Sequence, residues 1–122
     1  MDLKLKGKTA LITGGSQGIG LAVAEALAAE GVMLILSARH AAKLQKAKEQ
    51  LQAKYGVAVH THAADLSRAE DIEKLVESAL AAFDRIDILI NNAGTGTDET
   101  IENSRDEDWY YYWDLHVMAA IR

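Results

Sequence analysis

Four short apolar runs alternate with segments in which apolar residues recur at helical spacing, and this alternation limits the chain to a small set of folds. The apolar runs are residues 9–13, 32–36, 57–63 and 86–90. Helical spacing predicts helices over residues 18–30 and 43–55, and capping-box sequences at Ser67 and Ser104 predict two more, ending at Phe83 and Arg122. The runs are too apolar to have a face in water, which indicates parallel strands covered by helices on both sides.

The order βαβαβαβα predicts an α/β fold, a doubly wound, Rossmann-like parallel sheet in three α/β/α layers. Ligands of such a sheet bind at the carboxyl ends of its strands. No linker, repeat or low-complexity segment divides the 122 residues, so we expect a single domain over residues 1–122.

Composition excludes several classes of function. The chain has no cysteine, so it has no disulfide framework and no thiolate metal site, and it suits a reducing compartment. Its net charge of −5 argues against nucleic acid or an anionic membrane as the main partner. No apolar run is long enough to span a bilayer, and residues 1–8 lack the apolar core of a signal peptide, so we expect a cytoplasmic protein. His60 and His62 share a strand face without a third ligand, and no metal site is expected.

A glycine-rich loop, TGGSQGIG at residues 13–20, joins the first expected strand to the first expected helix. In this position Gly14 permits a tight turn, Gly18 lets the backbone approach a phosphate, and Gly20 lets the helix pack closely on the sheet. The N-terminus of that helix would then face a pyrophosphate. A glycine-rich connection without a ligand is the alternative, and the missing Gly-Lys-Ser/Thr ending disfavours a nucleoside-triphosphate P-loop.

The glycine spacing is G-x-x-x-G-x-G, Asp65-Leu66 follows the third strand, and Asn91-Asn92-Ala93-Gly94 follows the fourth. Together these features resemble the short-chain dehydrogenase/reductase family. The resemblance covers residues 9–94 and implies the N-terminal, cofactor-binding half of an oxidoreductase. Such an enzyme transfers a hydride between a nicotinamide cofactor and a carbonyl or secondary alcohol.

The same resemblance implies a set of cofactor-binding residues. The adenine would contact Asp65 and Leu66. For Asn91 and Asn92 there is an alternative to cofactor binding, since asparagines after a strand often only satisfy the backbone of a turn. The pyrophosphate and ribose would be lined by Gly14, Ser16, Gln17, Gly18, Ile19 and Gly20, and the floor under the ribose and nicotinamide would be formed by Asn91, Ala93 and Gly94.

The end of the second strand bears on which cofactor binds. An NAD site needs a carboxylate there for the ribose 2′-hydroxyl, and this chain has Ala38 at that position. Arg39 could instead contact a 2′-phosphate, and Ser37 could add a hydrogen bond, so we predict NADP in preference to NAD. Gln17 departs from this pattern, because NADP-preferring relatives often carry a second basic residue there. A surface arginine without a ligand is the other interpretation of Arg39.

The catalytic pair that the resemblance implies, Tyr-x-x-x-Lys, does not occur in this sequence. Tyrosines 55, 110, 111 and 112 are followed four residues later by valine, aspartate, leucine and histidine. The family's serine and Tyr-x-x-x-Lys come after its fifth helix, where this sequence ends, so we expect the chain alone to be inactive. His116 stands where the family usually has an asparagine and could replace it, or could simply pack in a helix interface.

The last expected helix carries five of the seven aromatic residues, in the sequence WYYYW at 109–113. A helix apolar on nearly all sides must be buried on nearly all sides, so one face should pack on the sheet and the other on a partner. The resemblance implies that this helix joins a homo-oligomer interface. The fourth strand would also be an unprotected edge. We expect either that a second half of the family fold covers this edge and the last helix, or that the chain self-associates through them.

The sequence leaves two other functions open. A noncatalytic nucleotide-binding or oligomerising module would contain the same loop without the catalytic pair. An S-adenosylmethionine-dependent methyltransferase also has a glycine loop after its first strand, but usually an acidic residue after the second, where this chain has Ala38-Arg39.

Overall fold

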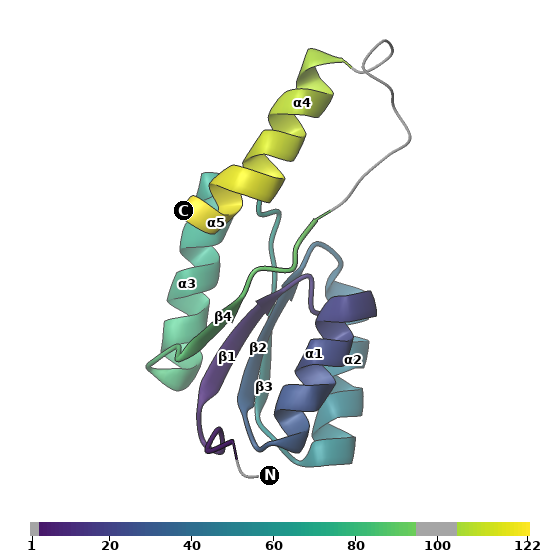
Figure 1. The fold of residues 1–122 in the computed structure, drawn as a ribbon, viewed down its shortest axis with the longest axis vertical. Helices are drawn as coiled ribbons and strands as arrows, with labels where there is room; N and C mark the ends of the chain where they lie inside the picture. The colour runs from purple at the N-terminus through teal and green to yellow at the C-terminus, as the bar shows by residue number, and fades with distance from the viewer. Residues whose placement is uncertain (1–2, 95–104) are drawn as a thin grey trace.

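The computed structural model describes residues 3–94 and 105–122, and these form four strands, five α-helices and a short π-helical segment, η1 (Figure 1). In chain order they are β1 (Thr9–Thr13), α1 (Gly18–Ala29), β2 (Met33–Ala38), α2 (Ala41–Tyr55), β3 (Val59–Ala63), α3 (Ala69–Phe83), β4 (Ile88–Ile90), α4 (Asp106–Trp113), η1 (Asp114–Met118) and α5 (Ala119–Ile121). The predicted alternation of strands and helices is confirmed.

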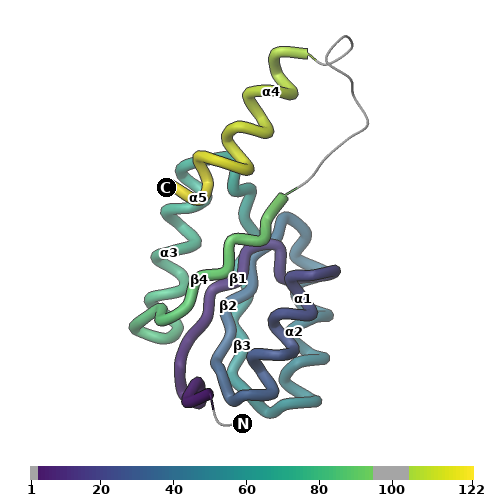
Figure 2. The backbone as a smooth tube through the Cα atoms, in the orientation of Figure 1, coloured from purple at the N-terminus to yellow at the C-terminus, as the bar shows by residue number. Residues whose placement is uncertain are grey.

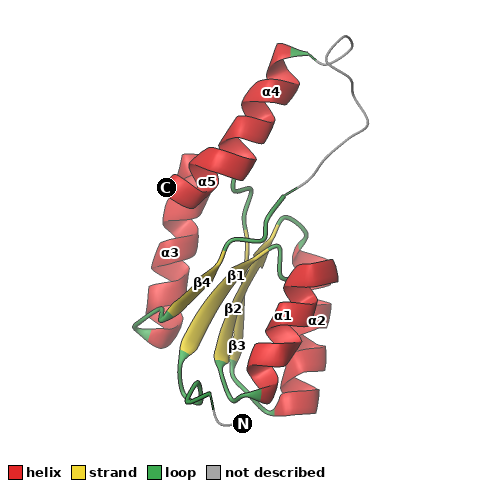
Figure 3. Ribbon diagram, in the orientation of Figure 1, coloured by secondary structure: helices red, strands yellow, loops and turns green. Residues whose placement is uncertain are grey.

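The four strands form one parallel sheet in the order β3-β2-β1-β4. Helices α1 and α2 cover one face and α3 covers the other, which gives the predicted three layers (Figure 3). Because the chain runs outward from β1 to β2 and β3, and then returns to the other side of β1, the strand order reverses between β1 and β4. Ligands of doubly wound sheets bind outside the carboxyl ends of the strands at such a reversal.

Alternate residues of the strands build two cores, one on each face of the sheet. In β1, Ala10 and Ile12 pack with the residues of α1 and α2, whereas Leu11 packs with those of α3. The middle of β2 is wholly buried, which explains its continuous apolar sequence. β4 differs, because Leu89 pairs with Leu11 and yet is 52% exposed. The face of the sheet at β4 is therefore incompletely covered.

The predicted capping box at Ser67 is wrong. Helix α3 begins one residue later than that box requires, with Arg68 at the N-cap position and no side-chain capping bond. The Ser67 amide and hydroxyl both donate to Asp65 Oδ1, at 3.0 and 2.6 Å, so Ser67 belongs to the turn before the helix rather than to its N-cap. At α4 the Asp108 carboxylate accepts hydrogen bonds from the Arg105 amide at 3.2 Å and from the Arg105 guanidinium at 3.3 and 3.2 Å; Ser104 lies outside the described residues.

The sequence predicts that the last helical segment packs one face on the sheet, but this segment does not lie along the sheet (Figure 1). Segments α4, η1 and α5 follow one another and rise beyond the carboxyl ends of the strands, with α5 beside α3 (Figures 1 and 2). Leu115 is the only buried residue between 105 and 122 and packs in the core on the α3 side. Trp109, Tyr110 and Trp113 are exposed. No helix among the described residues is long and apolar enough to cross a membrane.

Candidate functional site

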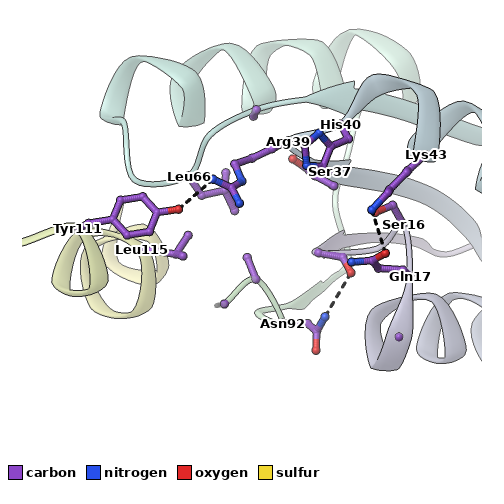
Figure 4. A pocket seen from close by; sticks show the side chains of 16 residues that line it. Ser16, Gln17, Ser37, Arg39, His40, Lys43, Leu66, Asn92, Tyr111 and Leu115 are labelled. Atoms are coloured by element: carbon purple, nitrogen blue, oxygen red, sulfur yellow. Dashed lines mark hydrogen bonds between the residues drawn. The ribbon is translucent and has the colours of Figure 1, made fainter. Parts of the chain in front are cut away.

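A pocket of about 370 Å³ lies at the carboxyl ends of the strands, where the sequence pattern predicts a ligand. Its walls come from the glycine loop, the end of β2, the start of α2, the segments after β3 and β4, and the last helical segments (Figure 4). The lining residues are Gly14, Ser16, Gln17, Gly18, Ser37, Ala38, Arg39, His40, Lys43, Ala64, Leu66, Asn92, Ala93, Gly94, Tyr111 and Leu115.

The glycine loop turns sharply and lets α1 approach the segment after β4. Gly14 has a φ of +69°, which L side chains rarely adopt, and its amide donates to the Ser37 carbonyl at 2.8 Å. A Cβ at Gly20 would overlap the Gly14 carbonyl oxygen and lie 2.6 Å from Asn92 Nδ2. The loop is thus a backbone-lined cradle that a larger residue at position 20 would displace.

Thr13 joins the end of β1 to the loop after β4. Its hydroxyl oxygen accepts hydrogen bonds from the amides of Asn92 and Ala93, both at 3.0 Å. The same hydroxyl donates to the Ile90 carbonyl at 3.3 Å, and Asn92 Nδ2 donates to the Gly14 carbonyl at 3.3 Å. These bonds hold two pocket walls at a fixed separation.

The end of β2 supplies both a buried hydroxyl and a cation. Ser37 is fully buried, and its hydroxyl has no hydrogen-bond partner among the described residues although it lines the pocket. A buried hydroxyl without a partner is costly, and a polar ligand would satisfy it. Two residues on, Arg39 Nη1 donates to the Tyr111 hydroxyl at 3.2 Å (Figure 4).

A second cation enters the pocket from α2. Lys43 lies in the first turn of that helix, and its Nζ donates to Gln17 Oε1 at 3.3 Å (Figure 4). Gln17 is the N-cap residue of α1 but makes no side-chain capping bond, so its amide is directed to Lys43 instead.

The structure brings together nine of the residues that the sequence predicts at the cofactor site and leaves four outside the pocket lining. The nine are Gly14, Ser16, Gln17, Gly18, Ser37, Arg39, Leu66, Ala93 and Gly94. Of the others, Ile19 is 76% exposed, Gly20 is buried beneath the loop, and Asn91 is exposed. The Asp65 carboxylate accepts bonds from the amide and hydroxyl of Ser67, which orders the turn before α3.

Several lining residues were not predicted. The motif after β4 contains Asn92, but of its two asparagines the sequence resemblance assigns only Asn91 to the site. Lys43 lies in the first turn of α2, and its place at the pocket depends on how that helix packs beside the glycine loop. Tyr111 and Leu115 likewise have no local signal, since their place depends on how the last helix crosses the end of the sheet.

His116 lies at the edge of this region, in η1. Its ring stacks on Tyr112 with the centroids 5.7 Å apart, and its Nε2 lies 3.2 Å from where a Cβ at Gly94 would be. Single π-helical turns occur frequently at functional sites. Far from the pocket, His60 Nε2 lies 2.7 Å from Ser78 Oγ, and no cluster of metal-ligating side chains occurs in residues 3–94 and 105–122.

Residues 8–122 match the family model described as short chain dehydrogenase. Among curated proteins, the chain is 45% identical to D-beta-hydroxybutyrate dehydrogenase of Cupriavidus necator over 95% of its own length and 45% of that protein. The structure is similar to that of L-sorbose reductase from Gluconobacter frateurii complexed with NADPH and L-sorbose, with a TM-score of 0.96 and 49% identity over 99% of this chain and 46% of that one.

A short chain dehydrogenase/reductase from Burkholderia phymatum in complex with NAD is also similar, with a TM-score of 0.91 and 32% identity over 98% of this chain and 42% of that one. The chain thus spans slightly less than half the length of these relatives.

Proposed function

The chain belongs to the short chain dehydrogenase family, and from this membership we propose that it is the nicotinamide-cofactor-binding part of an oxidoreductase. The cofactor, when bound, gives or accepts a hydride, and the substrate is a small carbonyl compound or secondary alcohol. The proposal extends to one domain over residues 1–122 in a cytoplasmic protein. Its main support is the pocket at the carboxyl edge of the sheet, where nine residues of the predicted cofactor set meet.

The residues present fit a dinucleotide. The turn at Gly14 and the start of α1 present backbone to a pyrophosphate, and the closeness of Gly20 to the Gly14 carbonyl leaves no side chain in the way. The unpartnered, buried Ser37 hydroxyl would gain a partner from the ribose or its substituent. Leu66 and Leu115 offer apolar surface for the adenine ring.

We propose NADP(H) as the preferred cofactor, and the observation that carries this proposal is the pocket-facing pair at the end of β2. Ala38 occupies the position of the carboxylate that an NAD site requires, and Arg39 follows it at the rim. Similar structures contain either NADPH or NAD, so preference depends on residues of this kind rather than on the family.

The test is a fluorescence titration of the chain with NADPH and NADH. We expect tighter binding of NADPH, and we expect Ala38→Asp to lower NADPH affinity by at least about tenfold, since it places a carboxylate beside the 2′-phosphate. Ala42→Asp is the matched control, because Ala42 is exposed in the same region but does not line the pocket. Tighter binding of NADH by the unaltered chain would contradict the NADP(H) assignment.

We also propose that His116 takes the place of the family's usual asparagine. Imidazole can both donate and accept a hydrogen bond, and His116 lies against Gly94 at the side of the pocket. In hydride transfer by the protein that carries this chain, we expect His116→Asn to retain activity and His116→Ala to lose at least about tenfold. Full activity of His116→Ala would assign the ring to packing on Tyr112.

The exposed aromatic surface of the last helix supports assembly with a second copy. Trp109, Tyr110 and Trp113 are all more than half exposed, and a cluster of this kind on one helix marks an interface. Sedimentation of the chain and of Trp109→Gln/Trp113→Gln tests this. A monomer at all concentrations would favour the alternative in which the surface meets another part of the same protein.

A further inference from the structure

Two cations from different elements line the same pocket. Arg39 follows β2, and Lys43 lies one helical turn further along, at the start of α2. In Figure 4 Ser37 and His40 lie between them, with the Arg39 guanidinium directed to Tyr111 and Lys43 Nζ directed to Gln17. Lys43 belongs to none of the motifs discussed above.

Neither cation is neutralised by a carboxylate. Arg39 donates to the Tyr111 hydroxyl and Lys43 to the Gln17 amide oxygen, and both acceptors are uncharged. None of the ion pairs within residues 3–94 and 105–122 involves Arg39 or Lys43. In a chain with a net charge of −5, this is a local excess of positive charge that favours an anion.

Two further features favour the same kind of ligand. The buried Ser37 hydroxyl lies between the two cations in the lining and lacks a hydrogen-bond partner in the described structure. The N-terminus of the 15-residue helix α2 adds partial positive charge, and its N-cap residue His40 makes no side-chain capping bond. A phosphate here could accept hydrogen bonds from the hydroxyl and from both cations.

We propose that Lys43 is a second cation for the ribose 2′-phosphate of the cofactor and that Gln17 is the positioning residue that holds it at the pocket. Preference for the phosphorylated cofactor then arises from two elements, β2 through Arg39 and α2 through Lys43. This inference rests on the proposed NADP(H) function. It also accounts for the neutral residue at position 17, because the amide positions a lysine instead of supplying the charge itself.

The test compares neutral variants at two exposed lysines of the same helix. Lys43→Gln removes the proposed cation, and Lys46→Gln removes an equal charge from an exposed residue outside the pocket lining. The dissociation constants of NADPH and NADH are measured by fluorescence titration. Those of adenosine 2′,5′-bisphosphate and 5′-AMP are measured by calorimetry, since these two nucleotides differ only in the 2′-phosphate.

We expect Lys43→Gln to weaken NADPH and adenosine 2′,5′-bisphosphate by about tenfold, and to change NADH and 5′-AMP by less than about twofold. Lys46→Gln should change all four by less than about twofold. Lys43→Arg should retain most of the affinity for the bisphosphate. Adding Gln17→Lys to Lys43→Gln should restore part of it, since the two side chains are within hydrogen-bonding distance.

Equal effects of Lys43→Gln and Lys46→Gln on NADPH would overturn the inference, as would an equal loss of NADPH and NADH in Lys43→Gln. These outcomes are distinct from failure of the proposed function, in which the unaltered chain binds neither dinucleotide or prefers NADH. Circular dichroism of each variant separates loss of the charge from loss of the fold.

Discussion

Arg39 Nη1 donates a hydrogen bond to the hydroxyl of Tyr111 at 3.2 Å, across 72 positions of sequence. The bond connects the end of β2 to the last helical segment, which also meets the rest of the chain through Leu115 in the core on the α3 side, with Tyr111 and Ala119 packed against that core. Because the acceptor is neutral, it fixes the direction of the guanidinium without removing its charge. The last helix thereby contributes to a site that is otherwise built from the first three βα units and the loop after β4.

Tyr111→Phe tests this connection. The bond is exposed to solvent, so we expect a loss of stability below about 1 kcal/mol and a decrease in NADPH affinity of about two- to threefold, since Arg39 would be less ordered before binding. Both are measured by urea denaturation and fluorescence titration. Tyr110→Phe is the matched control, because Tyr110 is 68% exposed and does not line the pocket. Identical behaviour of the two variants would show that the bond does not orient Arg39.

Thr13 provides a second test, at the junction of β1 and the loop after β4. Thr13→Val keeps the shape of the side chain but removes the acceptor of two amides, so we expect destabilisation of about 1–3 kcal/mol. Thr13→Ser keeps the hydroxyl and loses a methyl group, which should cost less than about 1 kcal/mol. Urea denaturation measures both. A loss of stability in Thr13→Ser with none in Thr13→Val would instead assign the role of Thr13 to packing of its methyl group.

The glycine loop allows two kinds of constraint to be separated. Gly20→Ala places a Cβ against the Gly14 carbonyl oxygen and Asn92, and should destabilise the chain by about 1–3 kcal/mol while weakening NADPH binding. Gly18→Ala meets no atom within 4 Å and carries only the strain of a φ of +59°, about 1 kcal/mol. Thermal unfolding, monitored by circular dichroism, ranks the two variants by stability. A smaller loss of stability in Gly20→Ala than in Gly18→Ala would contradict the close approach of position 20 to the Gly14 carbonyl oxygen.

The sequence predicts the sheet and the glycine loop well because both depend on neighbouring residues. Strand β2 is identified by a continuous apolar run, and the turn at Gly14 by its place between a strand and a helix. Side-chain partnerships are less predictable. Ser67 has the spacing of a helix cap, yet it lies in the turn before α3 and donates to the Asp65 carboxylate two residues away. Lys43 and Tyr111 join the site through α2 and α4, whose orientations depend on tertiary packing.

At the amino ends of β1 and β4, away from the pocket, the Asp87 carboxylate makes the stability of the fold depend on pH. Its Oδ2 accepts a hydrogen bond from the amide of Thr9 at 2.9 Å, and Arg85 forms an ion pair with its other oxygen. The amide bond, followed by the bond from Arg85, lowers the pKa of the Asp87 carboxyl below its ordinary value of 3.8. A carboxyl with a lowered pKa stabilises the fold above its unfolded value, and this contribution is lost as the pH falls through the folded pKa.

We therefore expect Asp87→Asn to lower stability at neutral pH and to reduce the further loss of stability as the pH falls below about 4. The measurement is urea denaturation at a series of pH values. Asp84→Asn, three residues earlier at the end of α3, removes the same charge and keeps the contact with Thr9, so its pH profile should follow that of the unaltered chain. An Asp87→Asn profile parallel to the unaltered one would show that the Thr9 amide contributes no acid-sensitive stability.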